Sequence, residues 1–224
     1  MSIRDMLSQA VEDYLKAIFV LQSGSSVSTS VLASRLQVSS ASVTKMIKRL
    51  SGLGLVTYVS YKGVRLTEAG EKIALEIIRH HRLLETYLRD IMGYDWDKMH
   101  EEAEHLEHHI SEEFENHLDR MLGYPTHDPH GHPIPSREGV MITVESEPLP
   151  DCPDNTLLRI RRVADSNTSV LQQLEDLGLL PGTSLQISNK ESDMMKIILA
   201  TDDTQIHLTN DLAAHVFASK EDDQ

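Results

Sequence analysis

Apolar side chains recur at helical spacing through the first fifty residues. The segments that carry such an apolar stripe are residues 11–21, about 29–36 and 39–50. In the next segment, 56–66, β-branched and aromatic residues flank Lys62 and Gly63, which predicts a hairpin. The second and third of these segments, two short helices joined by a tight turn and followed by the hairpin, are the parts of a winged helix-turn-helix. We therefore expect a DNA-binding domain over residues 1–70.

Two longer helices are predicted downstream. Thr67 can cap the first, whose apolar stripe runs over 73–88 and which Gly93 ends. The second is expected over about 97–122. Seven of the eight prolines then fall within 125–153, which is interpreted as a loop or linker.

Strand-like runs return near the end of the chain. After about Thr156 they alternate with turn residues, and LEDLGLLPG (174–182) is interpreted as a helix-to-turn connection. This pattern predicts a small β-barrel over 156–224, behind a linker over 141–155. With a helical domain over 71–140, the chain is expected to be mainly α with small β parts.

The charge of the chain is unevenly distributed. The net charge of −14 disfavours DNA binding, because phosphate neutralisation dominates affinity for DNA. Residues 1–70, however, hold 8 Lys and Arg against 4 Asp and Glu, a net of +4. An acidic body behind a mildly basic head predicts DNA affinity that must be switched on, although a solvated acidic surface is the simpler interpretation.

The sequence predicts neither a membrane helix nor a secretory leader. No stretch approaches about 18 apolar residues, and the N-terminal pattern carries acids. A cytoplasmic protein with no membrane partner is therefore expected. The single cysteine, Cys152, agrees with a reducing compartment and argues against a thiolate metal cluster.

The second helix of the helix-turn-helix is expected to enter the major groove. Opposite its apolar face it presents hydroxyl groups and a cation suited to base edges and phosphates: Ser39, Ser40, Ser42, Thr44 and Lys45. Further phosphate contacts are expected from this helix and the hairpin: Lys48, Arg49, Lys62 and Arg65. Polar helix faces are common, so the local excess of positive charge is what favours DNA.

Histidines and carboxylates gather in the middle of the chain. Ten of the twelve histidines lie within residues 80–132. On the helix predicted over 97–122, four side chains are expected to share one face: His100, Glu104, Glu107 and His108. His81 and Glu85 form an i, i+4 pair on the preceding helix, and Asp13 lies on the polar edge of the first helix. Three helices could thus supply ligands to one or two metal sites.

The ligand types select a class of metal. Carboxylates and imidazoles without thiolate suit Mn²⁺ or Fe²⁺, with Zn²⁺ or Co²⁺ as tighter-binding competitors. A solvated, charge-rich helix face is the alternative, but carboxylates this close would repel one another without a cation. Five other histidines are expected at the surface: His105, His109, His117, His127 and His132.

The chain resembles, over nearly its whole length, the diphtheria-toxin-repressor family of metalloregulators, and within it the manganese transport regulators; seven segments carry the resemblance. These segments are VEDYLKAIF (11–19), SSASVTKMIKRL (39–50), LTEAGEKIA (66–74), HRLLETYL (81–88), AEHLEHH (103–109), PHGHPIP (129–135) and LGLLPGTSLQI (177–187). The resemblance implies a homodimer that binds operator DNA when loaded with Mn²⁺ or Fe²⁺ and represses metal-uptake genes. It also implies an SH3-like, FeoA-type fold for the C-terminal domain.

The resemblance implies a main metal site as well. Its ligands would be Asp13, Glu104, Glu107 and His108, with His81 as a bridge to a second site. Iron-sensing members carry methionine at the position of Asp13 and cysteine at that of Glu104, whereas manganese sensors carry carboxylates at both. This chain has the manganese pattern, and hard carboxylate ligands favour Mn²⁺.

For the second site the resemblance leaves two ligand sets. One is His81, Glu85 and His100; the other joins Glu85 to a Cys-x-His pair in the linker and an acid of the C-terminal domain. Here Asp128 stands at the cysteine position and is followed by His130, and Asp165 is the candidate acid. Lys16 replaces a glutamate of the short manganese regulators, which disfavours a binuclear centre of their type.

Two other classes of protein fit part of the pattern. A metalloenzyme would use the Glu and His residues as a catalytic centre, but the helix-turn-helix would then go unexplained. A metal-delivery accessory protein is suggested by the FeoA-like tail, and such a protein would bind metal without affinity for DNA.

Overall fold

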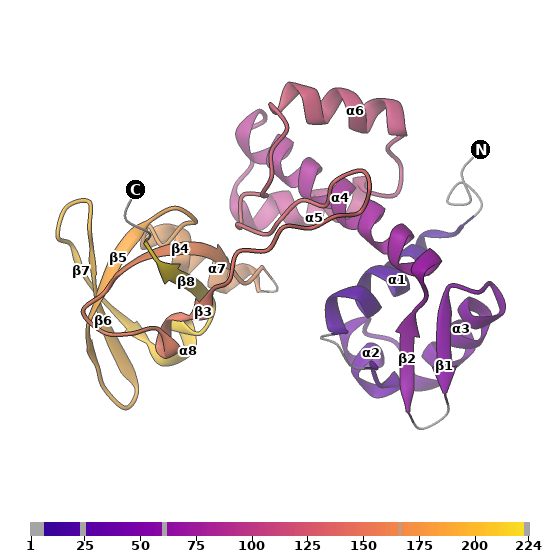
Figure 1. Cartoon of the computed structure of the whole chain (residues 1–224), viewed down its shortest axis with the longest axis horizontal. Helices are drawn as coiled ribbons and strands as arrows, with labels where there is room; N and C mark the ends of the chain where they lie inside the picture. The colour runs from indigo at the N-terminus through magenta and orange to yellow at the C-terminus, as the bar shows by residue number, and fades with distance from the viewer. Residues whose placement is uncertain (1–6, 23–25, 60–61, 166, 222–224) are drawn as a thin grey trace. The chain divides into compact units, whose positions relative to one another are not determined.

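The computed structural model describes residues 7–22, 26–59, 62–165 and 167–221. Its residues divide into two compact units (Figure 1). The first holds Met1–His81, Leu106–Ser111 and Pro135–Val140, and the second holds Arg82–His105, Glu112–Ile134 and Met141–Gln224. None of the described helices is both long enough and apolar enough to cross a membrane.

The first unit begins with three short helices and a hairpin, in the predicted order. These are α1 (Gln9–Leu21), α2 (Thr29–Arg35), α3 (Ser40–Gly52), β1 (Val56–Val59) and β2 (Gly63–Leu66), the two strands being antiparallel. Two helices start at serines that accept a backbone N–H: Ser28 from Val31 and Ser39 from Ser42, each at 3.2 Å. The predicted winged helix-turn-helix is confirmed.

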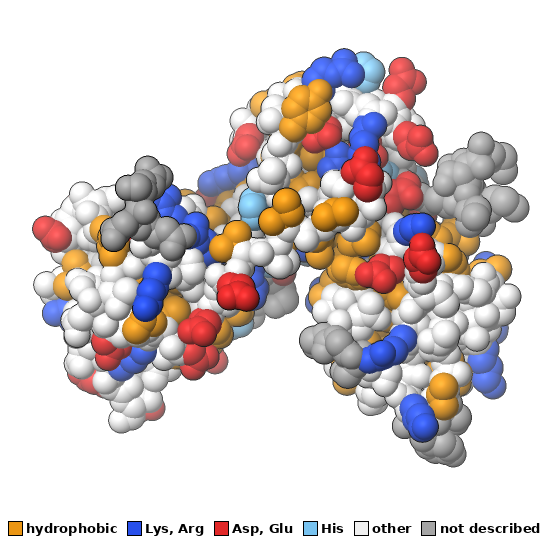
Figure 2. Space-filling model, in the orientation of Figure 1, with side chains coloured by type: hydrophobic (Ala, Val, Ile, Leu, Met, Phe, Trp, Pro, Cys, Tyr) orange, Lys and Arg blue, Asp and Glu red, His pale blue; other side chains and the backbone are white. Residues whose placement is uncertain are grey.

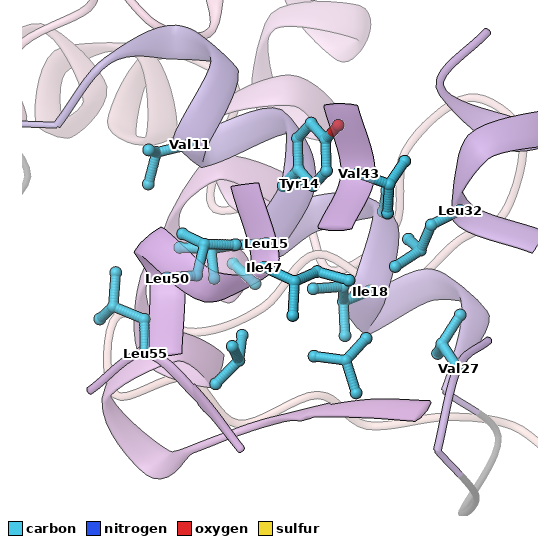
Figure 3. Close-up of a cluster of buried hydrophobic side chains, with 14 of the residues drawn as sticks. Val11, Tyr14, Leu15, Ile18, Val27, Leu32, Val43, Ile47, Leu50 and Leu55 are labelled. Atoms are coloured by element: carbon cyan, nitrogen blue, oxygen red, sulfur yellow. The ribbon is translucent and has the colours of Figure 1, made fainter. Parts of the chain in front are cut away.

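One apolar core holds these elements together (Figure 3). Leu15 and Ile18 of α1 pack with Ile47 and Leu50 of α3 and with Leu32 of α2, and all five side chains are fully buried. Burial of each such side chain stabilises the fold by roughly 1.5–3 kcal/mol. The orientation of α3 is therefore coupled to that of α1.

The hairpin is fixed to the segment before α2. Val27 and Val64 exchange two backbone hydrogen bonds of 2.9 Å. Gly63 has φ +96°, and a Cβ at this position would lie 2.6 Å from the carbonyl oxygen of Val27. Only glycine allows this close approach, because any side chain would clash with the backbone.

Helix α4 (Glu68–Asp90) begins where the sequence predicts and runs from the first unit into the second. Thr67 accepts the N–H of Gly70 at 3.2 Å, which caps the helix. Gly93, with φ +71°, follows the end of the helix. The long central helix is thus predicted correctly at both ends.

The prediction of one helix over 97–122 is wrong. Helix α5 (Trp96–Leu106) ends before Glu107, and α6 (Glu112–Met121) follows after a turn. The carbonyl of Glu107 accepts a hydrogen bond of 3.2 Å from Nδ1 of His80, a fully buried histidine. A tertiary contact thus replaces the helical N–H that this carbonyl would otherwise receive.

The C-terminal part of the second unit is a six-stranded antiparallel sheet with strand order β3-β8-β4-β5-β6-β7. Its elements are β3 (Glu147–Pro148), the 3₁₀ helix η2 (Leu149–Asp151), β4 (Leu157–Val163), α7 (Thr168–Asp176), β5 (Ser184–Lys190), β6 (Met194–Leu199), β7 (Gln205–Thr209), α8 (Asn210–Ala213) and β8 (Val216–Lys220). The predicted small β domain is confirmed.

This sheet starts earlier than the sequence predicts. Pro148 was placed in the linker, but β3 pairs with β8 and extends the sheet. An edge strand tolerates proline, because its outer N–H has no partner to lose. Between α6 and β3, residues 122–146 contain no described helix or strand, in agreement with the predicted loop.

Candidate metal centres and nucleic-acid interface

The outward face of α3 carries the residues predicted to contact DNA. Those that are exposed are Ser39, Ser40, Ser42, Lys45, Lys48 and Arg49, together with Lys62 and Arg65 on the hairpin. Figure 2 shows Lys and Arg side chains, in blue, over α3 and beside the hairpin. Thr44 is half-buried and its hydroxyl donates to the carbonyl of Ser40 at 2.8 Å. Thr44, like the capping Ser39, therefore contributes to the helix itself, and the other side chains form the cationic surface.

Three predicted ligands converge within the first unit. Asp13 comes from α1, whereas Glu107 and His108 come from the turn after α5. Nε2 of His108 lies 3.0 Å from Oδ1 of Asp13 and 3.6 Å from Oε1 of Glu107. Glu107 is fully buried, and Asp13 keeps 42% of its side chain exposed. We call these three residues the first centre. They offer two carboxylates and one imidazole, and the partly exposed Asp13 side chain leaves the group accessible to solvent.

Glu12 orients the imidazole of this centre. Its Oε2 accepts a hydrogen bond of 2.5 Å from Nδ1 of His108, and Glu12 is 4% exposed. Burial lowers the pKa of His108, but hydrogen bonds to Asp13 and Glu12 and the charge of Glu107 raise it to about 9. A carboxylate on Nδ1 leaves Nε2 facing the other ligands, the usual arrangement behind a metal-binding histidine. Glu12 is not among the ligand-site residues predicted from the sequence, because adjacent helix residues point about 100° apart.

Lys16 contacts the buried carboxylate of the first centre. Its Nζ donates to both oxygens of Glu107, at 2.7 and 2.9 Å, and lies 3.3 Å from Nδ1 of His81. Nδ1 of His81 is itself 2.6 Å from Oε2 of Glu107. The ammonium group of Lys16 therefore neutralises the Glu107 carboxylate on the side that faces His81. A metal ion bound on that side would have to compete with Lys16 for the carboxylate.

The four side chains predicted on one helix face belong to two units. Glu107 and His108 follow α5 in the first unit, whereas His100 and Glu104 lie on α5 in the second. Nδ1 of His100 is 2.8 Å from Oε1 of Glu85, and its Nε2 is 4.0 Å from Oε1 of Glu104. The single-stripe prediction is wrong, since α5 ends at Leu106; the role of Glu104 in the main site stays a prediction.

A second cluster of acids and imidazoles lies in the second unit. One ligand atom from each of Asp128, His130 and His132 lies within 4.8 Å of the other two. Nδ1 of His130 is 3.7 Å from Oε2 of Glu85 on α4, and Nδ1 of His132 is 3.7 Å from Oδ2 of Asp165, after β4. We call these five residues the second centre.

The prediction of a surface position for His132 is wrong, since only 14% of its side chain is exposed. The other four histidines expected at the surface are exposed: His105, His109, His117 and His127.

The second centre contains buried polar atoms without hydrogen bonds. Among the described residues, none forms a hydrogen bond to Oδ2 of Asp128, to either ring nitrogen of His130 or to Nδ1 of His132. Oδ2 of Asp128 lies 3.5 Å from Nε of Arg82 and 3.6 Å from Nδ1 of His132. Buried polar atoms normally form hydrogen bonds, because a buried polar atom without a hydrogen bond destabilises the folded protein. Carboxylate and imidazole atoms that converge in this way fit a divalent cation.

The charges of the second centre act on one another. Burial lowers the pKa of His130, but the carboxylates of Glu85, Asp128 and Asp165 outweigh burial and raise it. Burial raises the pKa of Asp165, but His132 and His130 outweigh burial and lower it. The charged forms of His130 and Asp165 are therefore favoured, because acids and imidazoles lie close enough to interact.

Three family models match successive parts of the chain. Residues 6–64 match the iron dependent repressor N-terminal DNA binding domain, residues 67–136 match the iron dependent repressor metal binding and dimerisation domain, and residues 147–220 match the FeoA domain. The last match begins at β3, where the sheet begins.

Curated relatives extend over nearly the full length. The diphtheria toxin repressor of Corynebacterium efficiens is 30% identical over 227 residues, which cover 96% of this chain and 97% of that protein. The iron-dependent repressor IdeR of Mycobacterium tuberculosis is 27% identical over 210 residues, which cover 86% and 90%.

Solved structures agree with these matches. A manganese-dependent transcriptional repressor in complex with manganese is 32% identical, with a TM-score of 0.87 over 94% of this chain and all of that one. ScaR with bound Zn²⁺ is 31% identical, with a TM-score of 0.79 over 94% of this chain and 99% of that one. Among these relatives, IdeR is named as iron-dependent and the first solved structure as manganese-dependent, and ScaR holds Zn²⁺.

Proposed function

Because the chain belongs to the diphtheria-toxin-repressor family of metal-dependent transcriptional repressors, we propose that it represses metal-uptake genes in response to Mn²⁺, as a homodimer on double-stranded operator DNA. Its relatives are DNA-binding repressors rather than enzymes, so the metalloenzyme alternative is set aside. The observation that carries the proposal is the meeting of Asp13 on α1 with Glu107 and His108 in the turn after α5.

The choice of Mn²⁺ rests on the donor atoms. The first centre offers two carboxylates and an imidazole, which are hard to borderline ligands. The only thiol, Cys152, lies 3.5 Å from the carbonyl oxygens of Glu147 and Pro148, and burial raises its pKa. Since the thiolate is the form that ligates metal, a raised pKa disfavours Cys152 as a ligand.

Asp13 couples the first centre to the DNA-reading helix. The next two residues of α1, Tyr14 and Leu15, are buried in the core that also holds Ile47 of α3. A change in the position of α1 is therefore transmitted to α3 through close-packed side chains. Fixing Asp13 against the turn after α5 would restrict the orientations of the DNA-binding head, the winged helix-turn-helix formed by α1 to β2.

Repulsion between acidic side chains disfavours the approach of Asp13 to the turn after α5 unless a positive charge compensates it. Glu12, Asp13 and Glu107 all lie near His108, and like charges this close repel one another. A divalent cation would supply the compensating charge when bound. In its absence, the protonated imidazole of His108 contacts Asp13, and the ammonium of Lys16 contacts Glu107.

Two features support a dimer on duplex DNA. The matched central domain is described as a dimerisation domain. Large apolar side chains are also exposed in the second unit at the end of α4 and around α6: Ile91, Met92, Phe114, Met121 and Tyr124. A second copy of the chain would cover such a surface. Two heads held in a dimer fit the two halves of a palindromic operator.

A retardation experiment tests the metal and the DNA together. The probe is a double-stranded fragment that the Mn²⁺-loaded protein selects from a random-sequence pool. Separate titrations with Mn²⁺, Fe²⁺ and Zn²⁺ should give tight binding with Mn²⁺ and weak binding with chelator. Equal binding with chelator would contradict the switch, and a response to Fe²⁺ but not Mn²⁺ would contradict the choice of metal. Metal binding without any DNA affinity would favour a metal-delivery protein.

A further inference from the structure

The segment His130-Gly131-His132 carries two imidazoles on one loop. The sequence pattern and the resemblance account for His130, whereas His132 has no assigned role. In the structure Nδ1 of His132 lies 3.6 Å from Oδ2 of Asp128 and 3.7 Å from Oδ2 of Asp165, and no described residue forms a hydrogen bond to it. We propose that His132 is a metal ligand of the second centre, with Asp128, His130 and Asp165.

The loop fixes the carboxylate that both imidazoles face. Oδ1 of Asp128 accepts the backbone N–H groups of His130 and His132, each at 2.9 Å. One oxygen of Asp128 is thus used by the loop itself. The other oxygen, Oδ2, lies 3.6 Å from Nδ1 of His132. The carboxylate cannot rotate without losing the two hydrogen bonds to Oδ1.

Glycine at position 131 allows the loop to pack against β4. Gly131 has φ +85°, and a Cβ there would lie 2.0 Å from the carbonyl oxygen of Arg161. The N–H of Val163 also donates to the carbonyl of His130 at 2.9 Å. The loop is therefore held against the strand that leads to Asp165, and both imidazoles are positioned before any ligand binds.

The donor set indicates which cation the site would take. Asp128 offers a carboxylate and His130 an imidazole, and His132 adds a second imidazole. Two imidazoles with the carboxylates of Asp128, Asp165 and Glu85 suit a divalent cation such as Mn²⁺ or Co²⁺. Nε of Arg82 lies 3.5 Å from Oδ2 of Asp128, so a bound cation would either displace this guanidinium or bind next to its positive charge.

Equilibrium dialysis of the full-length protein against Mn²⁺ tests this assignment, with Co²⁺ absorption as a second readout. The wild type should bind two ions per protomer, and His132→Ala should weaken one of them at least 10- to 100-fold and change the Co²⁺ spectrum. His127→Ala is the matched control, since His127 is an exposed histidine of the same loop. Circular dichroism checks that both variants fold.

The outcomes separate this inference from the proposed function on which it rests. Two ions per protomer in His132→Ala, with unchanged affinity and spectrum, would overturn the role of His132. One ion in the wild type, lost in Asp13→Ala, would overturn the second centre but leave the repressor intact. Loss of one ion in His132→Ala would support the inference even if the protein failed to bind DNA.

Discussion

Nδ1 of His108 lies 2.5 Å from Oε2 of Glu12, the residue that precedes the proposed ligand Asp13 on α1. Two consecutive residues of the DNA-binding head therefore contact opposite nitrogens of one imidazole, because Nε2 of His108 is 3.0 Å from Asp13. This arrangement makes the position of α1 sensitive to the charge on His108 and to any cation that binds beside it.

Replacing Glu12 by glutamine should weaken Mn²⁺ binding at the first centre about 10- to 100-fold, as loss of a partner behind a ligating histidine typically does. The amide keeps the shape of the side chain but removes the charge that holds the imidazole. Isothermal titration calorimetry measures the change. Glu68→Gln is the control, since Glu68 is an exposed acid of the same unit; equal affinities for both variants would exclude an orienting role for Glu12.

Replacing Lys16 by glutamine should destabilise the metal-free protein by about 3–5 kcal/mol, because Glu107 would stay buried without its ammonium partner. Mn²⁺ would meet less competition, so the metal-induced rise in Tm should be larger than in the wild type. Melting curves with chelator and with Mn²⁺ measure both effects. Lys72→Gln should change neither, since Lys72 forms an exposed pair with Glu68; a similar loss in both variants would contradict this account.

The metal-free protein should lose stability as the pH rises from neutral to 9. The folded protein raises the pKa of His108 from 6.5 to about 9, so it keeps a proton that the unfolded chain releases. This contribution is fully present below pH 6.5 and is lost as the pH passes through about 9. The difference in Tm between wild type and Glu12→Gln, measured with chelator, should therefore shrink towards high pH. A difference that grows with pH would contradict the assignment.

Replacing Lys48 by glutamine should weaken DNA binding by a similar factor on all sequences and lower the slope of log affinity against log salt by about 1. Lys48 is exposed on α3 beside the helix face that carries Ser40. Ser40→Ala, in contrast, should alter which sequences are selected. Anisotropy titrations over a salt series measure both effects, and an unchanged salt slope in Lys48→Gln would exclude a phosphate contact.

Elements defined by their own apolar periodicity were predictable from the sequence. The helices and hairpin of the head, and α4 with its cap at Thr67, follow from local pattern. The end of α5 at Leu106 was not predictable, because residues 97–122 contain no glycine or proline that would signal the end of a helix. A distant hydrogen bond, from His80 to the carbonyl of Glu107, accompanies it.

The meeting of Asp13 and His108 was predictable from the family pattern, whereas the helix face predicted to carry His108 is absent because α5 ends at Leu106. Glu12 was missed because helix periodicity separates it from Asp13, and His132 because the burial of a loop side chain depends on residues far along the chain. Asp165, which faces His132, comes after β4. Only the packing of the loop against that strand brings the two together.

The most direct test of the account is the effect of Mn²⁺ on DNA affinity in the wild type and in Asp13→Ala. Fluorescence anisotropy with the selected double-stranded fragment gives both constants, in Mn²⁺ and in chelator. The wild type should gain roughly 5- to 150-fold in affinity with Mn²⁺, the usual range of coupling between two sites, and Asp13→Ala should gain nothing while keeping its fold. Equal affinity of the wild type with and without Mn²⁺, or an undiminished gain in Asp13→Ala, would contradict the account.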